Sequence, residues 1–402
     1  MRRLIACLLF SLLAVSLHAE EKFRLGIIGT TTSHVPAFIK ALHAPDVGEP
    51  LNKFRIVAAY PGGVPDNPSS WGRVEQYAQD AEKQGIKLFS TIEAMLPEVD
   101  GVLLTSVDGR PHLEQAKPVI AAGKPLYIDK PMAVSLADVL EIFRLAKEKK
   151  VPVFSSSSLR YGPGYQKMRN EKPLGKIFGC NTWGPCSYND KHPDLFWYGI
   201  HGVEMLFTIM GTGCQTVSRT HTPGTDYVVG IWDEGRIGTF RGLRTGRAGF
   251  GATVFGEKGI EDAGTSGGYV PLVEDFCKFF QTGEPPFDPQ ETVEIFAFME
   301  AADVSRANGG TPVSIAETIE KAKTETAIPV SLLVSPNGSL QMNGKAIELG
   351  KLAEALDALA VGKPNSRVKV ILRAEKGTPH ETVLAVCNNL GKAMLANYLY
   401  ER

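Results

Sequence analysis

Apolar runs alternate with amphipathic stretches along the first 155 residues of the chain. Buried strands are indicated at Phe23–Ile28, Phe54–Tyr60, Val99–Ser106 and Pro125–Ile128, and helical spacing or helix-capping residues occur between and after these runs. Strands that alternate with helices are typical of a parallel sheet covered on both faces. The pattern therefore predicts an α/β fold with a doubly wound parallel sheet over residues 22–155.

The pattern changes from about residue 175, where strand-like segments follow one another. They are Cys180–Trp183, Tyr227–Trp232, Arg236–Arg241 and Ala252–Phe255. Two amphipathic helices, Val273–Phe280 and Glu291–Ala307, come next and are expected to close the same domain. Residues 156–315 are thus predicted to form an α+β domain with an open antiparallel sheet.

The last part of the sequence has its own, shorter pattern. Residues 316–327 form a charged linker or helix. Residues 328–402 contain two strands joined by the turn Pro336–Gly338, then a helix, a further strand and a longer helix over residues 378–397. We expect this part to be a small, separate α+β module.

Residues 1–19 have the features of a cleavable secretory signal. Arg2 and Arg3 precede a mostly apolar run, Leu4–Leu17, and cleavage is expected after Ala19. The run is shorter than the roughly 20 residues that a membrane-spanning helix needs. We therefore expect a periplasmic or secreted protein without a transmembrane segment after cleavage. The paired arginines leave open whether export uses the general secretory or the twin-arginine route.

Composition narrows the choice of ligands. The 402 residues include 43 basic and 44 acidic side chains, a formal net charge of −1, and this balance does not indicate a nucleic-acid ligand. Cys7 lies in the predicted signal, and the other five of the six cysteines match neither a disulfide framework nor a metal-ligand pattern. We expect buried thiols and no metal, with a bridge between Cys180 and Cys186 left open.

The clearest candidate for chemistry is Lys130. The apolar strand Pro125–Ile128 stops at Asp129-Lys130-Pro131. Ligands of an open parallel sheet bind beyond the carboxyl ends of its strands, so a lysine at this place is well positioned for catalysis. The alternative is a lysine that ends a strand and points into water.

The segment GKPLYIDKPMA, residues 123–133, resembles the glucose-fructose oxidoreductase, inositol dehydrogenase and rhizopine-catabolism family (Gfo/Idh/MocA), which has Glu-Lys-Pro where this chain has Asp-Lys-Pro. The resemblance covers about residues 23–315. It implies a Rossmann-like nucleotide-binding domain, NAD or NADP as cofactor and a sugar or cyclitol as substrate. In that family the lysine touches the nicotinamide ribose and the substrate hydroxyl, which implies a catalytic Lys130 and cofactor contacts from Asp129 and Lys130.

The turn after the first strand departs from the dinucleotide fingerprint Gly-x-Gly-x-x-Gly. Gly29 keeps the first position, whereas Thr31 and His34 replace the glycines that admit the pyrophosphate and allow close helix packing. The hydroxyls of Thr30, Thr31 and Ser33 could bind phosphate or cap the following helix. We take all five residues as candidate cofactor contacts.

Two further strand ends complete the expected cofactor site. Tyr60 follows the second strand, where an acidic residue usually holds the adenosine ribose. Thr105 and Ser106 follow the next long strand and, by the resemblance, flank the nicotinamide. His112 lies at the start of the helix after that loop, and its side chain either caps the helix or takes part in catalysis.

The second catalytic mark of the family is a histidine in Gly-Ile-His at the start of an apolar helix, here His201. Trp197 stands four residues earlier, where the family has Asp, and Tyr198 lies one turn before the histidine. The resemblance implies that His201 takes the hydroxyl proton and suggests Tyr198 as a proton relay. It also places Trp197, Tyr198, His201 and Arg160 near the substrate. The alternatives are that His201 is a buried core histidine and that Arg160 is paired with a nearby acid.

The tail resembles the periplasmic domain of ExbD/TolR energy-coupling proteins over about residues 326–398. This resemblance implies an interaction or dimerisation module and an envelope partner, and homo-oligomers fit it as well. The leading hypothesis is an exported NAD(P)-dependent oxidoreductase. Two alternatives remain open: a non-catalytic carbohydrate-binding or adaptor protein that retains the fold, and glycoside cleavage assisted by a trapped NAD.

Overall fold

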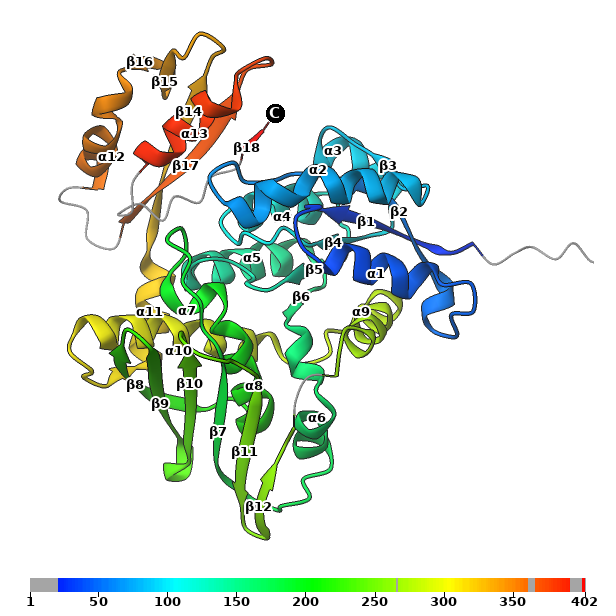
Figure 1. Ribbon diagram of the computed structural model, residues 1–402, viewed down its shortest axis with the longest axis vertical. Coiled ribbons are helices and arrows are strands. Elements are labelled where there is room, and N and C mark those ends of the chain that lie inside the picture. Colours follow the sequence, from blue (N-terminus) through cyan, green and yellow to red (C-terminus); the bar gives the residue numbers. More distant parts are fainter. Residues whose placement is uncertain (1–20, 265–266, 361–365, 391–399, 402) are drawn as a thin grey trace, which may run out of the picture.

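A computed structural model describes residues 21–264, 267–360, 366–390 and 400–401. The predicted signal peptide, and the end of the helix predicted over residues 378–397, lie outside these ranges. Three sheets organise the described chain, each with its own helices (Figure 1).

The first sheet is parallel throughout and has the strand order β3-β2-β1-β4-β5-β6. The order reverses between β1 and β4, and ligands of such sheets bind at this switch point. The doubly wound Rossmann-like prediction is confirmed. The elements are β1 Phe23–Ile28, α1 His34–His43, η1 Leu51–Lys53, β2 Phe54–Tyr60, α2 Pro68–Lys83, β3 Lys87–Leu88, α3 Ile92–Met95, η2 Leu96–Glu98, β4 Gly101–Leu104, α4 His112–Ala121, β5 Leu126–Asp129, α5 Leu136–Lys149 and β6 Val153–Ser156.

The second sheet has the order β12-β11-β7-β10-β9-β8-β13, with α8 and α10 packed against it (Figure 1). It is mixed and not purely antiparallel, because β7 and β10 pair in parallel while the other pairs are antiparallel. The elements are η3 Ser158–Tyr161, α6 Pro163–Asn170, β7 Ile177–Pro185, α7 Asp194–Trp197, α8 Ile200–Met210, β8 Cys214–Thr222, β9 Thr225–Trp232, η4 Asp233–Gly235, β10 Ile237–Leu243, β11 Gly251–Gly256, β12 Gly259–Asp262, α10 Pro289–Ala307, β13 Val313–Ser314 and α11 Ile315–Thr324.

Helix α9, Val270–Thr282, returns to the first sheet instead of closing the second domain. The ring of Phe276 lies 5.3 Å from that of Phe38 and 5.6 Å from that of Tyr127, both in the Rossmann-like domain. Amphipathic spacing identifies the apolar face of a helix but not the surface that the face covers. The expectation from the sequence was therefore wrong for this helix.

The third sheet belongs to the C-terminal module and has the order β16-β15-β14-β17-β18. Its elements are β14 Thr326–Val334, β15 Leu340–Met342, β16 Lys345–Ile347, η5 Leu349–Lys351, α12 Leu352–Ala360, β17 Ser366–Ala374, α13 His380–Asn389 and β18 Tyr400–Glu401. Apolar side chains of β14, β15, α12, β17 and α13 form its core, which also includes Val64 of the first domain.

Two expectations about the chain as a whole can be compared with the described residues. The five cysteines in the described ranges are buried and free. The expectation of buried thiols is therefore confirmed, and Cys180 and Cys186 do not form a disulfide. No described helix combines the length and apolarity needed to cross a membrane.

The docking of α9 predicts a stability effect. Phe276→Ala removes a buried ring from the contact with the Rossmann-like sheet and should lower the free energy of unfolding by about 3–5 kcal/mol. Urea denaturation measures the change. Ile260→Ala, at a side chain that is 69% exposed, is the control and should stay within about 0.5 kcal/mol of the parent.

Candidate functional site

Lys130 stands directly after β5, and its side chain is buried. Its exposure is 8%, and among the described residues its ammonium group makes no hydrogen bond or ion pair. The nearest recorded contact joins Nζ to the ring of Tyr198, at 5.9 Å from the centroid. Burial lowers the pKa of the ammonium, while the charges of Asp129 and Glu204 oppose that shift. An unpaired buried cation is costly for the fold, and such groups concentrate at functional sites.

The carboxylate of Asp129 fixes the turn that carries Lys130. One oxygen accepts the backbone N–H of Lys130 at 2.9 Å, and the other lies 2.5 Å from Nδ1 of His34. Burial alone would raise the pKa of this carboxyl, but His34 and the charge of Lys130 bring it below its usual value. The ring of Tyr269, just before α9, lies 4.7 Å from that of His34. Sequence reasoning missed this tyrosine because it comes from a distant segment.

His201, in the first turn of α8, reaches the same region from the second domain. Its Nδ1 lies 2.6 Å from the hydroxyl oxygen of Ser157, which also accepts the N–H of Leu159 at 3.1 Å. The ring of Tyr198 lies 5.0 Å from that of His201. Burial and then the charge of Lys130 lower the pKa of His201 well below its ordinary value, so the imidazole is neutral near pH 7. The structure thus brings Lys130, Tyr198 and His201 together.

Glu204, one helical turn after His201, joins α8 to the end of β6. Its carboxylate accepts the Ser156 hydroxyl, the Ser157 N–H and the Arg160 Nε–H, each at 2.8 Å. Sequence reasoning missed Glu204 and Ser157. The available signal was the i, i+3 spacing from His201 to Glu204, which places both on one helix face, and the serine run at the end of β6.

Arg160 is 2% exposed and is held by acids on two helices. Its Nε pairs with Glu204 at 2.8 Å and its Nη1 with Glu291 at 2.5 Å, while the guanidinium lies 3.8 Å from the ring of Phe287. The structure supports the alternative of an ion-paired arginine. Within the described ranges its Nη2 is buried without a hydrogen-bond partner, so binding of substrate by Arg160 stays a prediction beside this structural role.

Gly29 closes the turn after β1 in a conformation that requires glycine. Its φ is +90°, and a Cβ would lie 2.3 Å from the hydroxyl oxygen of Ser106. The Thr105 hydroxyl donates to the carbonyl of Gly29 at 2.9 Å, so the ends of β1 and β4 are tied together. His112, wholly buried, lies with its ring nitrogens near the carbonyls of Ser106 and Met132.

The threonine hydroxyls of this turn bind protein groups. Thr30 donates to the carbonyl of Val74 at 2.9 Å, and Thr31 accepts the N–H of Val107 at 2.9 Å. Both threonines are fully buried, whereas Ser33 is exposed at the start of α1. A phosphate at this helix terminus would therefore meet Ser33 and backbone amides rather than the two threonine hydroxyls.

The part of the expected cofactor site that would bind the adenosine departs further from the usual dinucleotide pattern. Tyr60 is half-buried at the end of β2, and its carbonyl accepts the N–H of Gly29 at 2.8 Å. The nearest following acid, Asp66, is buried against Arg110, with 2.8 Å between Oδ1 and Nη2. The groups at Gly29, at the start of α1 and at Lys130 thus fit a dinucleotide. Tyr60 stands where a carboxylate usually binds the adenosine ribose.

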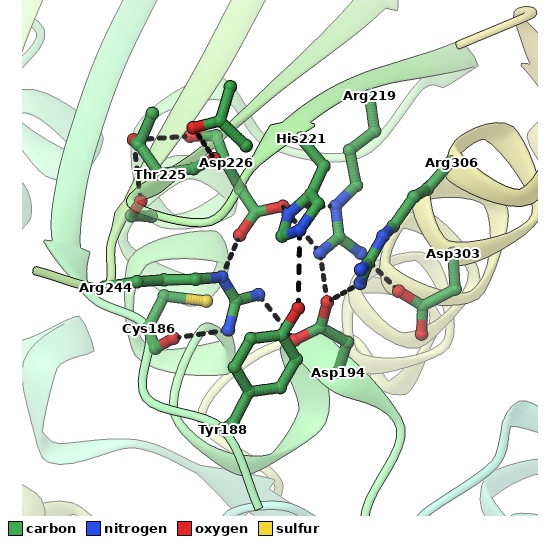
Figure 2. A network of polar contacts seen from close by, with 12 residues as sticks. Cys186, Tyr188, Asp194, Arg219, His221, Thr225, Asp226, Arg244, Asp303 and Arg306 are labelled. Carbon is green, nitrogen blue, oxygen red and sulfur yellow. Dashed lines mark hydrogen bonds and ion pairs between the residues drawn. The ribbon is translucent and has the colours of Figure 1, made fainter. Parts of the chain in front are cut away.

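Helix α7, which carries Trp197 and leads to Tyr198, is anchored by a polar network (Figure 2). Asp194, at its first residue, binds Arg219, Arg244 and Arg306. Asp226, His221 and Asp194 lie close enough to share a metal ion, but Asp226 is also paired with arginines. These cations occupy the carboxylates, so the network serves to position α7. The ring of Trp197 lies 4.7 Å from that of His192.

The structure thus joins a Rossmann-like domain to a mixed-sheet domain and a small C-terminal module. Residues 23–157 match the family model described as "Oxidoreductase family, NAD-binding Rossmann fold" (Gfo/Idh/MocA), and residues 293–398 match that of "Biopolymer transport protein ExbD/TolR". Both resemblances are confirmed over the matched residues: residues 23–157 form an NAD-binding Rossmann domain of the oxidoreductase family, and residues 293–398 match the ExbD/TolR family.

Individual relatives agree with this assignment. A 1,5-anhydro-D-fructose reductase of Ensifer adhaerens is 31% identical over 106 residues, which is 26% of this chain and 32% of that protein. An uncharacterized protein of Saccharomyces cerevisiae is 23% identical over 46% of this chain and 55% of its own length. The chain therefore spans about half or less of the length of these two relatives.

Solved structures share the fold. The myo-inositol dehydrogenase of Lactobacillus casei, in complex with NAD(H) and myo-inositol, is 15% identical with a TM-score of 0.59 and covers 73% of this chain and 96% of its own. GenD2 from gentamicin A biosynthesis, in complex with NAD, is 17% identical with a TM-score of 0.60 over the same shares.

The position of Arg160 predicts a structural role. Arg160→Met removes the arginine that links Glu204 and Glu291, so Glu204 keeps only the two serine donors and Glu291 keeps only Arg169. The loss of this buried ion pair should lower the free energy of unfolding by about 3–5 kcal/mol. Thermal and urea unfolding measure the loss. Unchanged stability together with weaker substrate binding would instead assign Arg160 to the substrate site.

Proposed function

We propose that the protein oxidises a secondary hydroxyl of a sugar or cyclitol, or reduces the corresponding ketone, with NAD or NADP. The observation that carries this proposal is the unpaired, buried ammonium of Lys130 beside the neutral imidazole of His201. The names of the reductase and the inositol dehydrogenase described above support the substrate class.

Each side chain has a chemical task in this proposal. Bound nicotinamide supplies the hydride acceptor or donor. The Lys130 ammonium donates a hydrogen bond to the substrate oxygen and stabilises negative charge that develops there. With Nδ1–H donating to Ser157, Nε2 of His201 presents a lone pair and takes the hydroxyl proton. Tyr198, between the two, packs against the substrate or relays that proton.

We place this chemistry in the cell envelope. The signal-like residues 1–19 support export, and the ExbD/TolR match supports an envelope partner for the module. Homo-oligomers fit this proposal as well.

One observation favours a second function, that of a non-catalytic adaptor. The fully buried hydroxyls of Thr30 and Thr31 are bound to the protein itself, although they stand in the fingerprint turn. Equilibrium dialysis of the purified protein with NAD and with NADP separates the two functions. Bound dinucleotide supports the enzyme, and binding of neither supports the adaptor.

Lys130→Met tests the ammonium. Methionine is one heavy atom shorter than lysine, so it keeps the apolar part of the side chain but removes the charge that stabilises the substrate oxygen. The value of kcat should fall at least 10²-fold, on the order expected for loss of one electrostatic contact in the transition state. Absorbance of the reduced nicotinamide at saturating cofactor measures the rate. Lys258→Met, at an exposed lysine, is the control. Equal turnover of Lys130→Met and the parent would reject the proposal.

The imidazole predicts a pH profile. A general base must be unprotonated, and the lowered pKa of His201 keeps it so below its ordinary value of 6.5. The plot of kcat/KM against pH should therefore show no decline near pH 6.5 and should fall only at lower pH. An acid limb at or above pH 6.5 would contradict this role of His201.

Ser157→Ala removes the hydrogen-bond partner of Nδ1 of His201 and should lower kcat about tenfold, which is part of the rate enhancement that a positioned base supplies.

A further inference from the structure

We propose that the C-terminal module positions the loop between β2 and α2, residues 61–67, so that docking of the module and binding of the dinucleotide strengthen each other. This inference rests on the proposed function, because it concerns the adenosine end of the same cofactor site.

The loop enters the core of the module. Val64 is 3% exposed and belongs to the apolar cluster formed by β14, β15, α12, β17 and α13. Gly62 and Gly63, with φ of +61° and +113°, let the backbone turn there, and a Cβ on Gly63 would lie 3.4 Å from the ring of Trp71. The double glycine after Tyr60 thus turns the chain where Val64 reaches the module.

An aromatic pair secures the contact. The ring of Trp71, in the first turn of α2, stacks on that of His380, the first residue of α13, with 4.6 Å between centroids and 4° between planes. A second anchor lies on α4 and α5. The buried ammonium of Lys369, on β17, pairs with Glu114 at 3.1 Å and Asp138 at 3.3 Å.

The same loop is bonded to the cofactor turn. The N–H groups of Gly29 and Thr30 donate to the carbonyls of Tyr60 and Pro61, each at 2.8 Å. The Thr30 hydroxyl reaches the carbonyl of Val74 in α2 at 2.9 Å. A displacement of the loop would therefore move the turn that receives the pyrophosphate.

The loop is also tied to the segment after β4. Asp66 pairs with Arg110, which pairs with Asp108 at 2.7 Å, and the Asn67 amide donates to Asp108 at 2.7 Å. All four side chains are buried. Contacts thus run without a break from the module to both loops at the switch point of the sheet. This continuity is the physical basis for coupling between the two sites.

The experiment uses the full chain and the variant His380→Ala, which removes the stacked ring and touches no residue of the proposed catalytic set. Calorimetry with NAD and NADP should show that the dissociation constant rises about three- to tenfold, the range expected for loss of one aromatic pair. Hydrogen exchange in residues 29–34 and 61–67 should become faster without cofactor. Glu381→Gln, at the exposed next residue of α13, is the matched control and should change neither quantity.

A second variant guards against local misfolding of α13. Lys369→Gln acts at the other anchor and should change both measurements in the same direction. If the parent binds a dinucleotide and both anchor variants bind it equally well, the inference is wrong while the proposed function stands. If the parent binds neither NAD nor NADP, the proposed function fails, and this inference fails with it. By linkage, cofactor should in turn slow exchange within α13 of the parent.

Discussion

The carboxylate of Glu204 is the contact on which the site depends. It is 4% exposed and accepts three hydrogen bonds, one from Ser156 at the end of β6 and two from Ser157 and Arg160 just after that strand. A buried carboxylate is tolerated only when its oxygens are hydrogen-bonded, so moving α8 away from the end of β6 would leave an oxygen of Glu204 without a donor. Because His201 stands one turn earlier on the same helix, this contact also sets the place of the imidazole relative to Lys130. The geometry of the catalytic pair is thus a consequence of domain docking.

Much of the architecture could be read from the sequence, because its signals are local. The alternation of strands and helices gave the parallel sheet, and the strand stop at Lys130 and the helix start at His201 gave the two candidate catalytic groups. The features that could not be predicted from the sequence concern long-range partners. Nothing local in Val270–Thr282 shows that this helix covers the first sheet, and nothing near Arg160 shows that Glu204 and Glu291 approach it. The orienting role of Ser157 depends on a helix 44 residues away.

The departures from the nucleotide fingerprint have partners inside the chain. Thr31 accepts a hydrogen bond from the loop after β4, and His34 lies against the carboxylate of Asp129, next to Lys130. These substitutions are therefore integrated into the packing and do not leave an unfilled site. They agree with a turn that holds its ligand through the backbone and helix α1, with support from outside the Rossmann-like domain. In the coupling proposed above, the C-terminal module, whose core includes Val64, is the source of that support.

The return of α9 has a consequence for how the polypeptide acquires its shape. The segment that matches the nucleotide-binding family ends at residue 157, yet the aromatic side chains that cover one side of its sheet arrive only with Val270–Thr282. During synthesis the Rossmann-like domain therefore keeps apolar surface exposed until more than a hundred further residues have left the ribosome. A fragment cut at the family boundary would keep that surface bare and would associate with itself. Sequence boundaries are therefore not the units in which this protein folds.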